Sequence, residues 1–323
     1  MTVLAPPEHA ARLSWAAADM NQSPRWRFDA SPAALRDSAT LAAWAASFDD
    51  AANRLERGLV RTPGLDALGD QIAAELDHGW GVAWVRGFES LDENTLRLTF
   101  LKLGLRFGPT IETYGRLYEV RDSGASYRDA AIPVSQTRAS TGMHTDSSGK
   151  HVRPGVVGLA CVRQAASGGR SRIASAARAH EVLRAKSPEL LRRLYGSFVR
   201  DIVTPGSDRA TERVAQNRFP VFSYDGRLGL RYMRYWIERG HQVVGEPLDA
   251  LDVAAFNALD DALQDPEHVL SVMMQPGQLL FIDNTTTVHD RDEYVDTAGA
   301  PRLMLRLWID HQTTPTKSTE LQP

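Results

Sequence analysis

The apolar positions in the first third of the chain recur with helical spacing. Ser31-Pro32 and Thr62-Pro63 each place a capping residue before a proline, which is typical of the first turn of a helix. Residues 82–85 form a short apolar strand, and a further helix is predicted over 91–107. The helix after Thr62 has one apolar face that ends at Gly79, and this face consists of Leu65, Leu68, Ile72 and Leu76. Residues 1–30 have no clear period and predict loops and a packed arm.

From about residue 117 the period shortens to that of strands. Asp225-Gly226 lies between two apolar runs and is the strongest hairpin signal in the chain. Helices are predicted over 177–195 and over 247–264, the latter with Leu251, Phe256, Leu259 and Leu263 facing inward. The predicted strands are 117–121, 156–162, 172–176, 219–224, 228–236, 268–273, 278–283 and 302–310. This order predicts a mainly β, α+β protein with a double-stranded β-helix (jelly roll) core covered by helices.

The length allows two domains, but β-barrel and sandwich domains often reach 200–250 residues as one unit. The chain has 323 residues, no internal repeat and no low-complexity linker. We therefore expect residues 1–323 to form a single catalytic domain. It would comprise an N-terminal arm and helices (1–60), a core with helical insertions (about 80–312) and a frayed tail (313–323).

Composition and charge exclude several classes of partner. The chain is 43% hydrophobic and 24% charged, with a net charge of −3 and no basic run, which argues against binding to nucleic acid or to an anionic membrane. No apolar stretch approaches 18 residues and no signal-like segment opens the chain. The single Cys161 lies in an apolar run and is expected to be a small buried hydrophobe. We expect a cytoplasmic protein.

A metal-binding pattern stands at His144-Thr145-Asp146, with a distant partner at His289. Side chains two residues apart on an extended segment project to the same side, so His144 and Asp146 share one face. Two imidazoles and one carboxylate are the ligands of the facial triad that binds non-haem Fe(II). A His-x-Asp pair alone is common by chance in a chain with nine histidines, so the surrounding residues must support the assignment.

Two arginines share one face of the last predicted strand. Arg302, Met304 and Arg306 alternate with Leu303, Leu305 and Leu307. If the leucines pack under the helices, two guanidiniums point into the core. A buried guanidinium requires an anion, and its fork matches a carboxylate. The pattern leaves two alternatives open, which are two anionic ligands or two internal salt bridges.

Taken together, these motifs resemble the Fe(II)/2-oxoglutarate dioxygenases of the taurine dioxygenase and clavaminate synthase-like superfamily. The resemblance covers about residues 80–312. It rests on the order and spacing of His144-x-Asp146, Gly168-Gly169-Arg170-Ser171, the Pro276-Gly277 strand that ends at Asp283-Asn284, His289-Asp290-Arg291 and Arg302-x-x-x-Arg306.

The resemblance implies a role for each site residue. His144, Asp146 and His289 would ligate Fe(II). Arg302, assisted by Ser171, would bind the far carboxylate of 2-oxoglutarate, and Arg306 would bind an acidic group of the prime substrate. Two departures from the family pattern stand out. Serine replaces threonine at 171, and Asp290 replaces a common glycine, which leaves open the hydrogen-bond partner of His289.

The implied reaction consumes O2 and 2-oxoglutarate, releases succinate and CO2, and hydroxylates an unactivated C–H bond of a small anionic substrate. An amino acid or derivative is the favoured substrate, with a sulfonate or phosphonate as the alternative, and a carrier-tethered substrate stays open. Halogenating relatives lack the carboxylate, so Asp146 argues against halogenation. The alternative from another class is a non-catalytic jelly-roll protein that binds an anionic ligand. The chain also leaves open whether it forms a homo-oligomer.

The remaining histidines have simpler interpretations. His151 follows Asp146 closely and is expected to be a solvated loop residue, with a substrate contact as the alternative. His180, His241, His268 and His311 lack carboxylates at ligand spacing, and we expect surface or capping positions for them.

Overall fold

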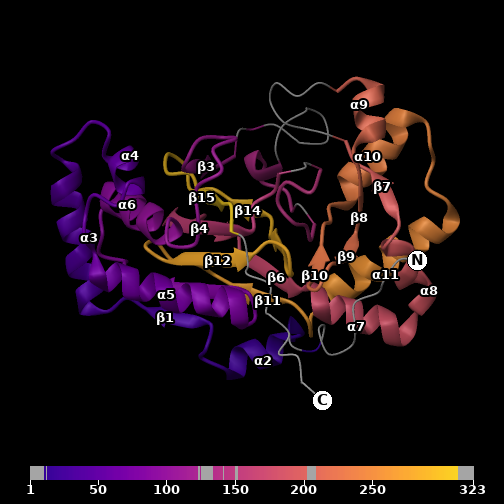
Figure 1. The fold of residues 1–323 in the computed structure, drawn as a ribbon, viewed down its shortest axis with the longest axis horizontal. Helices are drawn as coiled ribbons and strands as arrows, with labels where there is room; N and C mark the ends of the chain where they lie inside the picture. The colour runs from indigo at the N-terminus through magenta and orange to yellow at the C-terminus, as the bar shows by residue number, and fades with distance from the viewer. Residues whose placement is uncertain are drawn as a thin grey trace, which may run out of the picture.

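The computed structural model describes residues 11, 13–122, 124, 134–140, 142–149, 152–201 and 209–311. Two sheets lie at the centre of this part (Figure 1). The larger sheet contains, in spatial order, β1 (Arg27–Asp29), β2 (Val82–Arg86), β12 (Leu279–Asp283), β4 (Val156–Arg163), β15 (Leu303–Ile309) and β3 (Tyr118–Val120). The smaller sheet contains β11 (Leu270–Val272), β6 (Ser171–Ser175) and β13 (Thr287–Arg291). All these pairings are antiparallel except β1–β2.

Short strand pairs and helices surround the two sheets. The pairs are β9 (Phe222–Tyr224) with β10 (Leu228–Leu230), β5 (Ser167–Gly168) with β14 (Tyr294–Val295), and β7 (Ser197–Val199) with β8 (Arg218–Pro220). The N-terminal helices are α2 (Ala17–Gln22), α3 (Pro32–Ala45), α4 (Ala51–Glu56), α5 (Pro63–His78) and α6 (Glu93–Gly104). The later helices are η1 (Val134–Gln136), α7 (Ala176–Lys186), α8 (Pro188–Leu194), α9 (Thr211–Gln216), α10 (Arg234–Val244) and α11 (Ala250–Gln264).

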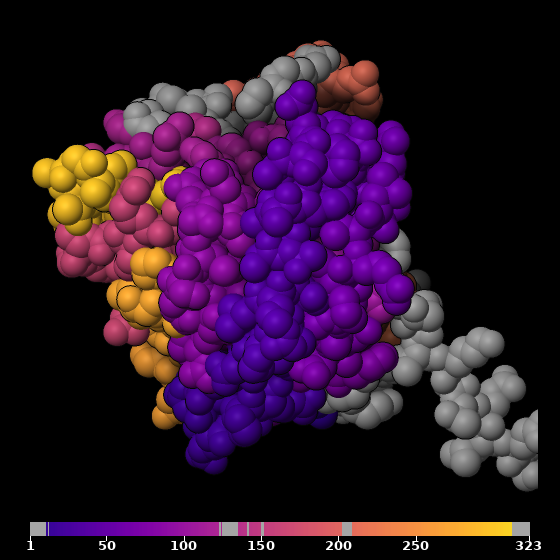
Figure 2. Space-filling view, turned by 90° about the vertical axis from the view of Figure 1, so that its left-hand side faces the viewer, coloured from indigo at the N-terminus to yellow at the C-terminus, as the bar shows by residue number. Residues whose placement is uncertain are grey.

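The helices form two groups on opposite sides of the sheets. In Figure 1, α3 to α6 lie at one end of the molecule and α7 to α11 at the other. Figure 2 shows the first group as a continuous indigo and violet surface over one face. This arrangement confirms the mixed helix-and-sheet class that the sequence predicts. Across the described residues, no helix combines the length and the apolarity needed to cross a bilayer.

Both predicted helix starts are confirmed, but only Ser31 caps its helix through its side chain, since Thr62 makes no such hydrogen bond. Ser31 Oγ accepts a hydrogen bond from the Ala34 N–H at 3.1 Å, and α3 begins at Pro32. Helix α5 begins at Pro63 and has Gly79 as its C-cap residue. Its predicted apolar face is fully buried. At the Asp225-Gly226 turn, Gly226 adopts φ +101°, a conformation that glycine tolerates, and β9 pairs with β10 as predicted.

The larger sheet has two different apolar faces. Its outer face packs against α3, α5 and α6 through residues such as Phe281, Leu305 and Leu307. Its inner face packs against β6 and β11 through alternate residues such as Leu280 and Met304. The predicted division is confirmed for Leu305 and Leu307, which pack outward, and for Met304 and Arg306, which line the pocket. Between Leu303 and Met304 the register shifts, so the simple alternation does not extend to Leu303.

Three local predictions are wrong. Residues 1–30 are not only loops and an arm, because they contain α2 and β1, and β1 pairs with β2. Residues 231–236 do not continue the hairpin strand, because pairing ends at Leu230 and α10 begins at Arg234. The buried residues of α10, which are Ile237, Gly240 and His241, follow helical spacing. In α11, Leu251 is 45% exposed, since this helix buries the face carrying Phe256, Leu259 and Leu263 instead.

Candidate functional site

Two histidines far apart in sequence meet where the 142–149 segment runs beside β13. The His144 N–H donates to the His289 carbonyl at 3.0 Å, and the His289 N–H donates to the His144 carbonyl at 2.9 Å. This isolated bridge places the two imidazole centroids 4.5 Å apart. The backbone pairing therefore brings the two predicted histidine ligands together.

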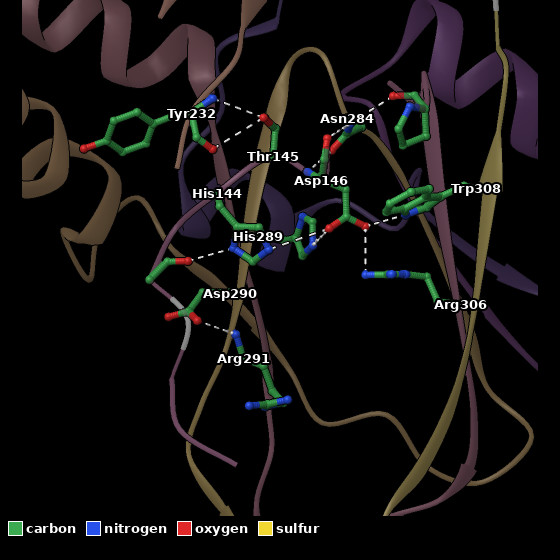
Figure 3. A network of polar contacts seen from close by, with 12 residues as sticks. His144, Thr145, Asp146, Tyr232, Asn284, His289, Asp290, Arg291, Arg306 and Trp308 are labelled. Atoms are coloured by element: carbon green, nitrogen blue, oxygen red, sulfur yellow. Dashed lines mark hydrogen bonds and ion pairs between the residues drawn. The ribbon is translucent and has the colours of Figure 1, made fainter. Parts of the chain in front are cut away.

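Asp146 completes a group of three donors with the two imidazoles (Figure 3). Its Oδ1 lies 3.8 Å from Nε2 of His144 and 3.8 Å from Nε2 of His289. One ligand atom from each residue lies within 4.8 Å of the other two. Two imidazole nitrogens and one carboxylate oxygen are the donor set of a facial triad, so these residues fit a divalent iron.

The backbone of Asp146 is held by Asn284, which follows β12. The Asp146 N–H donates to Asn284 Oδ1 at 2.8 Å, and Asn284 Nδ2 donates to the carbonyls of Asp146 and Pro154 at 3.1 and 2.9 Å. On the other side, the Thr145 N–H donates to the Tyr232 carbonyl at 2.8 Å. The segment that carries the triad is thus fixed from two directions.

The second carboxylate oxygen of Asp146 has protein partners of its own. Trp308 Nε1 donates to Oδ2 at 2.6 Å, and Arg306 Nη1 lies 3.5 Å from the same oxygen. Burial opposes ionisation of Asp146, but Arg306, the two histidines and Trp308 together hold its pKa below the usual value. The carboxylate is therefore an anion with Oδ1 directed at the imidazoles.

The His289 imidazole is suited to act as a neutral ligand. Burial, with a further contribution from His144, lowers the pKa of His289 to about 4. His144 Nδ1 lies 2.8 Å from the Gly142 carbonyl, which is consistent with an Nδ1–H that donates to this oxygen. His289 Nδ1 is buried and has no hydrogen-bond partner among the described residues.

The Asp290 carboxylate does not orient His289. It accepts from Ser140 Oγ at 3.0 Å and from Arg172 Nη1 at 3.2 Å. The departure from glycine at position 290 therefore serves contacts away from the imidazole ring.

The triad opens into a pocket that Arg302, Met304 and Arg306 also line. Arg302 is 3% exposed, and its Nη1 is buried without a hydrogen-bond partner in the described part of the chain. Its Nε donates to Gln164 Oε1 at 3.3 Å, and its guanidinium lies 5.2 Å from the Tyr294 ring centroid. Burial and the neighbouring Arg291 lower the pKa of Arg302 to about 10, so it remains a cation at neutral pH.

The sequence left two alternatives for the inward arginines, an internal salt bridge or an anionic ligand. Among the described residues, the internal salt bridge is present at Arg306 but not at Arg302. Arg306 forms an ion pair with Asp146, whereas no described carboxylate lies within ion-pair distance of the Arg302 guanidinium. A buried cation without an anion is unfavourable. The geometry at Arg302 fits an anionic ligand.

Ser171 reaches the same pocket from β6. The preceding turn passes close to Arg302, because a Cβ on Gly169 would lie 3.2 Å from Arg302 Nε. Gly169 also adopts φ +76°. Glycine at 169 therefore lets the turn approach the guanidinium, and Ser171 and Arg302 line the same pocket.

The sequence did not indicate the role of Trp308, which donates to Asp146, or of the pocket residues Arg291 and Ser135. Trp308 follows Arg306 on the inward face of β15, and alternation alone could have found it. Arg291 and Ser135 line the pocket, and no local pattern indicates this.

Other predicted positions have mixed outcomes. His151 lies outside the described residues. His180 is fully buried beside Tyr195, so the surface or capping position expected for it is wrong. His241 and His268 are buried and contact backbone carbonyls near helix ends. Cys161 is buried as expected, and burial raises its thiol pKa to about 11.

The sequence of this chain matches a family model and is similar to known proteins. Residues 53–308 match the model of the family described as "Taurine catabolism dioxygenase TauD, TfdA family". FR-33289 synthase of Streptomyces rubellomurinus (strain ATCC 31215) is 29% identical over 268 residues, which cover 79% of this chain and 76% of that protein. A uridine-5′-phosphate dioxygenase of a Streptomyces species is 33% identical over 54% of this chain and 63% of its own length.

Two solved structures share the fold. Asparagine oxygenase superposes with a TM-score of 0.67 at 17% identity, covering 88% of this chain and 93% of its own. The non-haem iron oxygenase OrfP, solved in complex with Fe and α-ketoglutaric acid, superposes with a TM-score of 0.65 at 15% identity, covering 88% of this chain and 94% of its own.

Proposed function

The chain belongs to the taurine catabolism dioxygenase TauD, TfdA family, and on this premise we propose that His144, Asp146 and His289 ligate its Fe(II). The protein is an Fe(II)- and 2-oxoglutarate-dependent dioxygenase. The convergence of three ligand atoms within 4.8 Å, in a pocket that also holds a buried unpaired arginine donor, carries the proposal.

Arg302 and Ser171 are the proposed binding residues for 2-oxoglutarate. The Arg302 Nη1, which has no partner among the described residues, supplies a hydrogen bond and a charge for the far carboxylate, and Ser171 lines the same pocket. Binding of this carboxylate would satisfy a donor that the protein leaves without a partner.

Arg306 is the proposed binding residue for an acidic group of the prime substrate. Its guanidinium is held between aromatic rings, 4.5 Å from the Trp308 centroid and 4.9 Å from the Tyr118 centroid. Apart from the ion pair with Asp146 it makes no hydrogen bond to a described residue. Its remaining donors are available for an anion.

The charges around the pocket support an anionic substrate. Three lining residues are cations, Arg291, Arg302 and Arg306, and two are acids, Asp146 and Asp290. Asp290 is already paired with Arg172. Fe(II) adds two positive charges, and 2-oxoglutarate supplies two negative ones. A positive excess remains for the substrate to balance.

The residues of the site position the reactants and keep water out. Bound Fe(II) and 2-oxoglutarate supply the activation of O2, with decarboxylation to succinate coupled to hydroxylation of a substrate C–H bond. Trp308 and Arg306 hold Oδ2 of Asp146, which leaves Oδ1 for the metal. Leu159, Leu280, Ile282 and Met304 form apolar walls that limit the access of water.

The favoured substrate is an amino acid or a derivative. The similar structures include asparagine oxygenase with 3-hydroxyasparagine and OrfP with 3-hydroxyarginine. The alternative is a substrate with a phosphate, phosphonate or sulfonate group, and the similarity to a uridine-5′-phosphate dioxygenase supports it. Asp146 occupies the position that a halide would need, so hydroxylation rather than halogenation is expected.

Within the mixed helix-and-sheet class, a more specific fold can be proposed. We infer that the two facing sheets form a double-stranded β-helix, with the triad at one of its ends. Residues 1–323 as one catalytic domain, a cytoplasmic location and a free small-molecule substrate remain predictions that go with this function.

The proposal is tested by adding Fe(II) and 2-oxoglutarate to the purified protein without oxygen. A metal-to-ligand charge-transfer band with one iron per chain is expected. L-asparagine, L-arginine, uridine 5′-phosphate and taurine are then tested in air for stimulated succinate release, with mass spectrometry of products formed in excess chloride. Absence of the band contradicts the function, and a chlorinated main product contradicts hydroxylation.

A further inference from the structure

A short segment that we call the strap, residues 135–140, forms part of the pocket wall through Ser135. Gln136 Nε2 donates to the hydroxyl of Tyr118 on β3 at 2.7 Å. On the far side of Gln136, Arg291 Nη2 donates to the carbonyls of Thr137 and Ala139 at 2.7 and 2.6 Å. The strap is therefore tied to both sheets.

The strand that carries the distal histidine holds one end of the strap. Ser140 Oγ donates to Asp290 Oδ2 at 3.0 Å, and Asp290 is 4% exposed and fixed by Arg172. Asp290 and Arg291 directly follow His289 in β13. Any movement of the strap therefore strains contacts beside the candidate metal site.

Ser135 differs from Ser38 and Ser175, two other buried serines among the described residues. It is 8% exposed, and its hydroxyl is buried without a hydrogen-bond partner among the described residues. In contrast, Ser38 Oγ donates to the Ala34 carbonyl at 3.1 Å, and Ser175 Oγ donates to the Leu13 carbonyl at 2.9 Å. A buried hydroxyl normally finds a partner, so its lack in a pocket wall points to a ligand.

The register of β3 places the strap near Arg306. Tyr118, which binds Gln136, is the direct partner of Arg306 across the β3–β15 pairing. The Arg306 guanidinium lies 4.9 Å from the Tyr118 ring centroid. Ser135, next to Gln136, therefore belongs to the part of the pocket proposed to receive the acidic group.

We propose that Ser135 is a specificity-determining residue whose hydroxyl binds a polar group next to the substrate's acidic group, and that Asp290 and Arg291 are positioning residues that hold the strap in place. The amino group of an α-amino acid has this relation to its carboxylate. A ligand whose only polar group is an acid bound to Arg306 would leave the hydroxyl without a partner. The inference rests on the proposed function and deepens it towards α-amino acids.

Ser135→Ala tests the first part. The KM for L-asparagine or L-arginine, whichever is turned over by the wild type, should rise about tenfold or more, as for loss of one hydrogen bond to a charged group. Half-saturation by 2-oxoglutarate in the charge-transfer titration should change less than about twofold. Ser47→Ala, an exposed serine before α4, is the matched control and should change neither value.

A stability measurement keeps the test independent of substrate. The Tm of the metal-free Ser135→Ala protein should equal or exceed that of the wild type, because no hydrogen bond is lost. Ser175→Ala, which loses two hydrogen bonds, should lower it. A loss in Ser135→Ala as large as in Ser175→Ala, or an unchanged KM, overturns the role of Ser135.

Arg291→Gln and Asp290→Asn test the positioning residues by amide hydrogen exchange of residues 135–140. Arg291→Gln should speed exchange there and raise the KM, whereas Asp290→Asn still accepts from Ser140 and should have a smaller effect. Equal exchange in Arg291→Gln and wild type overturns the positioning role. Absence of the charge-transfer band in the wild type would instead contradict the proposed function, so the two failures are distinguishable.

Discussion

The two ends of the pocket treat their polar groups in opposite ways. At the triad end, Asp146 has partners for its N–H, its carbonyl and one carboxylate oxygen, and Asn284 and Trp308 supply them. At the other end, Arg302 Nη1 is buried with no partner among the described residues, and the same holds for the Ser135 hydroxyl in the pocket wall. Satisfied groups define positions, whereas unsatisfied groups mark where ligands bind. The buried Nδ1 of His289 is an exception at the triad end.

The largest expected effect comes from removing a ligand at the triad end. His289→Ala should lose nearly all bound iron and all turnover, because two of the three donors cannot retain the metal. Metal content by mass spectrometry and succinate release measure the effect. His78→Ala, an exposed histidine at the end of α5, should retain both. Wild-type iron in the His289 variant would assign the ligand to another residue.

The second-largest effect is a difference in 2-oxoglutarate affinity between the Arg302 and Arg306 variants. Arg302→Ala should weaken 2-oxoglutarate binding by roughly 10- to 150-fold, corresponding to about 1.5–3 kcal/mol for a hydrogen bond to a charged group. Arg306→Ala should leave that affinity nearly unchanged and impair the coupling of succinate release to product formation.

The two arginine variants serve as controls for each other. Anaerobic titration of 2-oxoglutarate into the Fe(II)-loaded proteins, followed at the charge-transfer band, measures the affinity. Equal weakening in both variants, or the reverse order, would show that the assignment of the two guanidiniums is wrong.

Trp308→Phe tests whether the hydrogen bond to Oδ2 of Asp146 orients the carboxylate. The ring is retained and only the N–H donor is lost. Iron affinity should fall roughly 10- to 100-fold, the usual size for loss of a group that supports a metal ligand. Trp84→Phe, which loses a donor to Gln278 outside the triad, is the matched control. Unchanged iron affinity would mean that Arg306 alone positions Asp146.

The smallest effect concerns stability and compares the two ends directly. Asn284→Ala should lower the free energy of unfolding by about 1–3 kcal/mol, because it leaves buried backbone groups without partners. Arg302→Met removes a buried charge that has no acid and should leave the free energy of unfolding equal or higher. Urea denaturation of the metal-free proteins measures both. If Arg302→Met lost more free energy of unfolding than Asn284→Ala, the interpretation of the two ends of the pocket would be wrong.

Local patterns were sufficient to predict much of this protein. Helix starts at Ser31-Pro32 and Thr62-Pro63, the Asp225-Gly226 turn and the inward face of Arg302, Met304 and Arg306 depend on backbone preferences and on alternation within a few residues. The resemblance to the family also predicted His144, Asp146, His289 and Ser171 as site residues. The structure brings all of them to one pocket.

Where local periodicity was ambiguous, tertiary packing decided. Residues 231–236 alternate like a strand, yet pairing stops at Leu230 and the chain enters α10. His180 has no apolar signature, but it is buried against Tyr195. Burial depends on which elements meet, and a window of a few residues does not contain that information.

The partners of the site residues also required the tertiary structure. Asp146 receives its hydrogen bonds from Asn284 and Trp308, and Arg291 binds the strap, all through segments far apart in the chain. Whether a buried arginine has an acid beside it depends on these distant contacts. The sequence by itself determined which chemical groups enter the pocket, and only the packing of the two sheets decided which of them are left for a ligand.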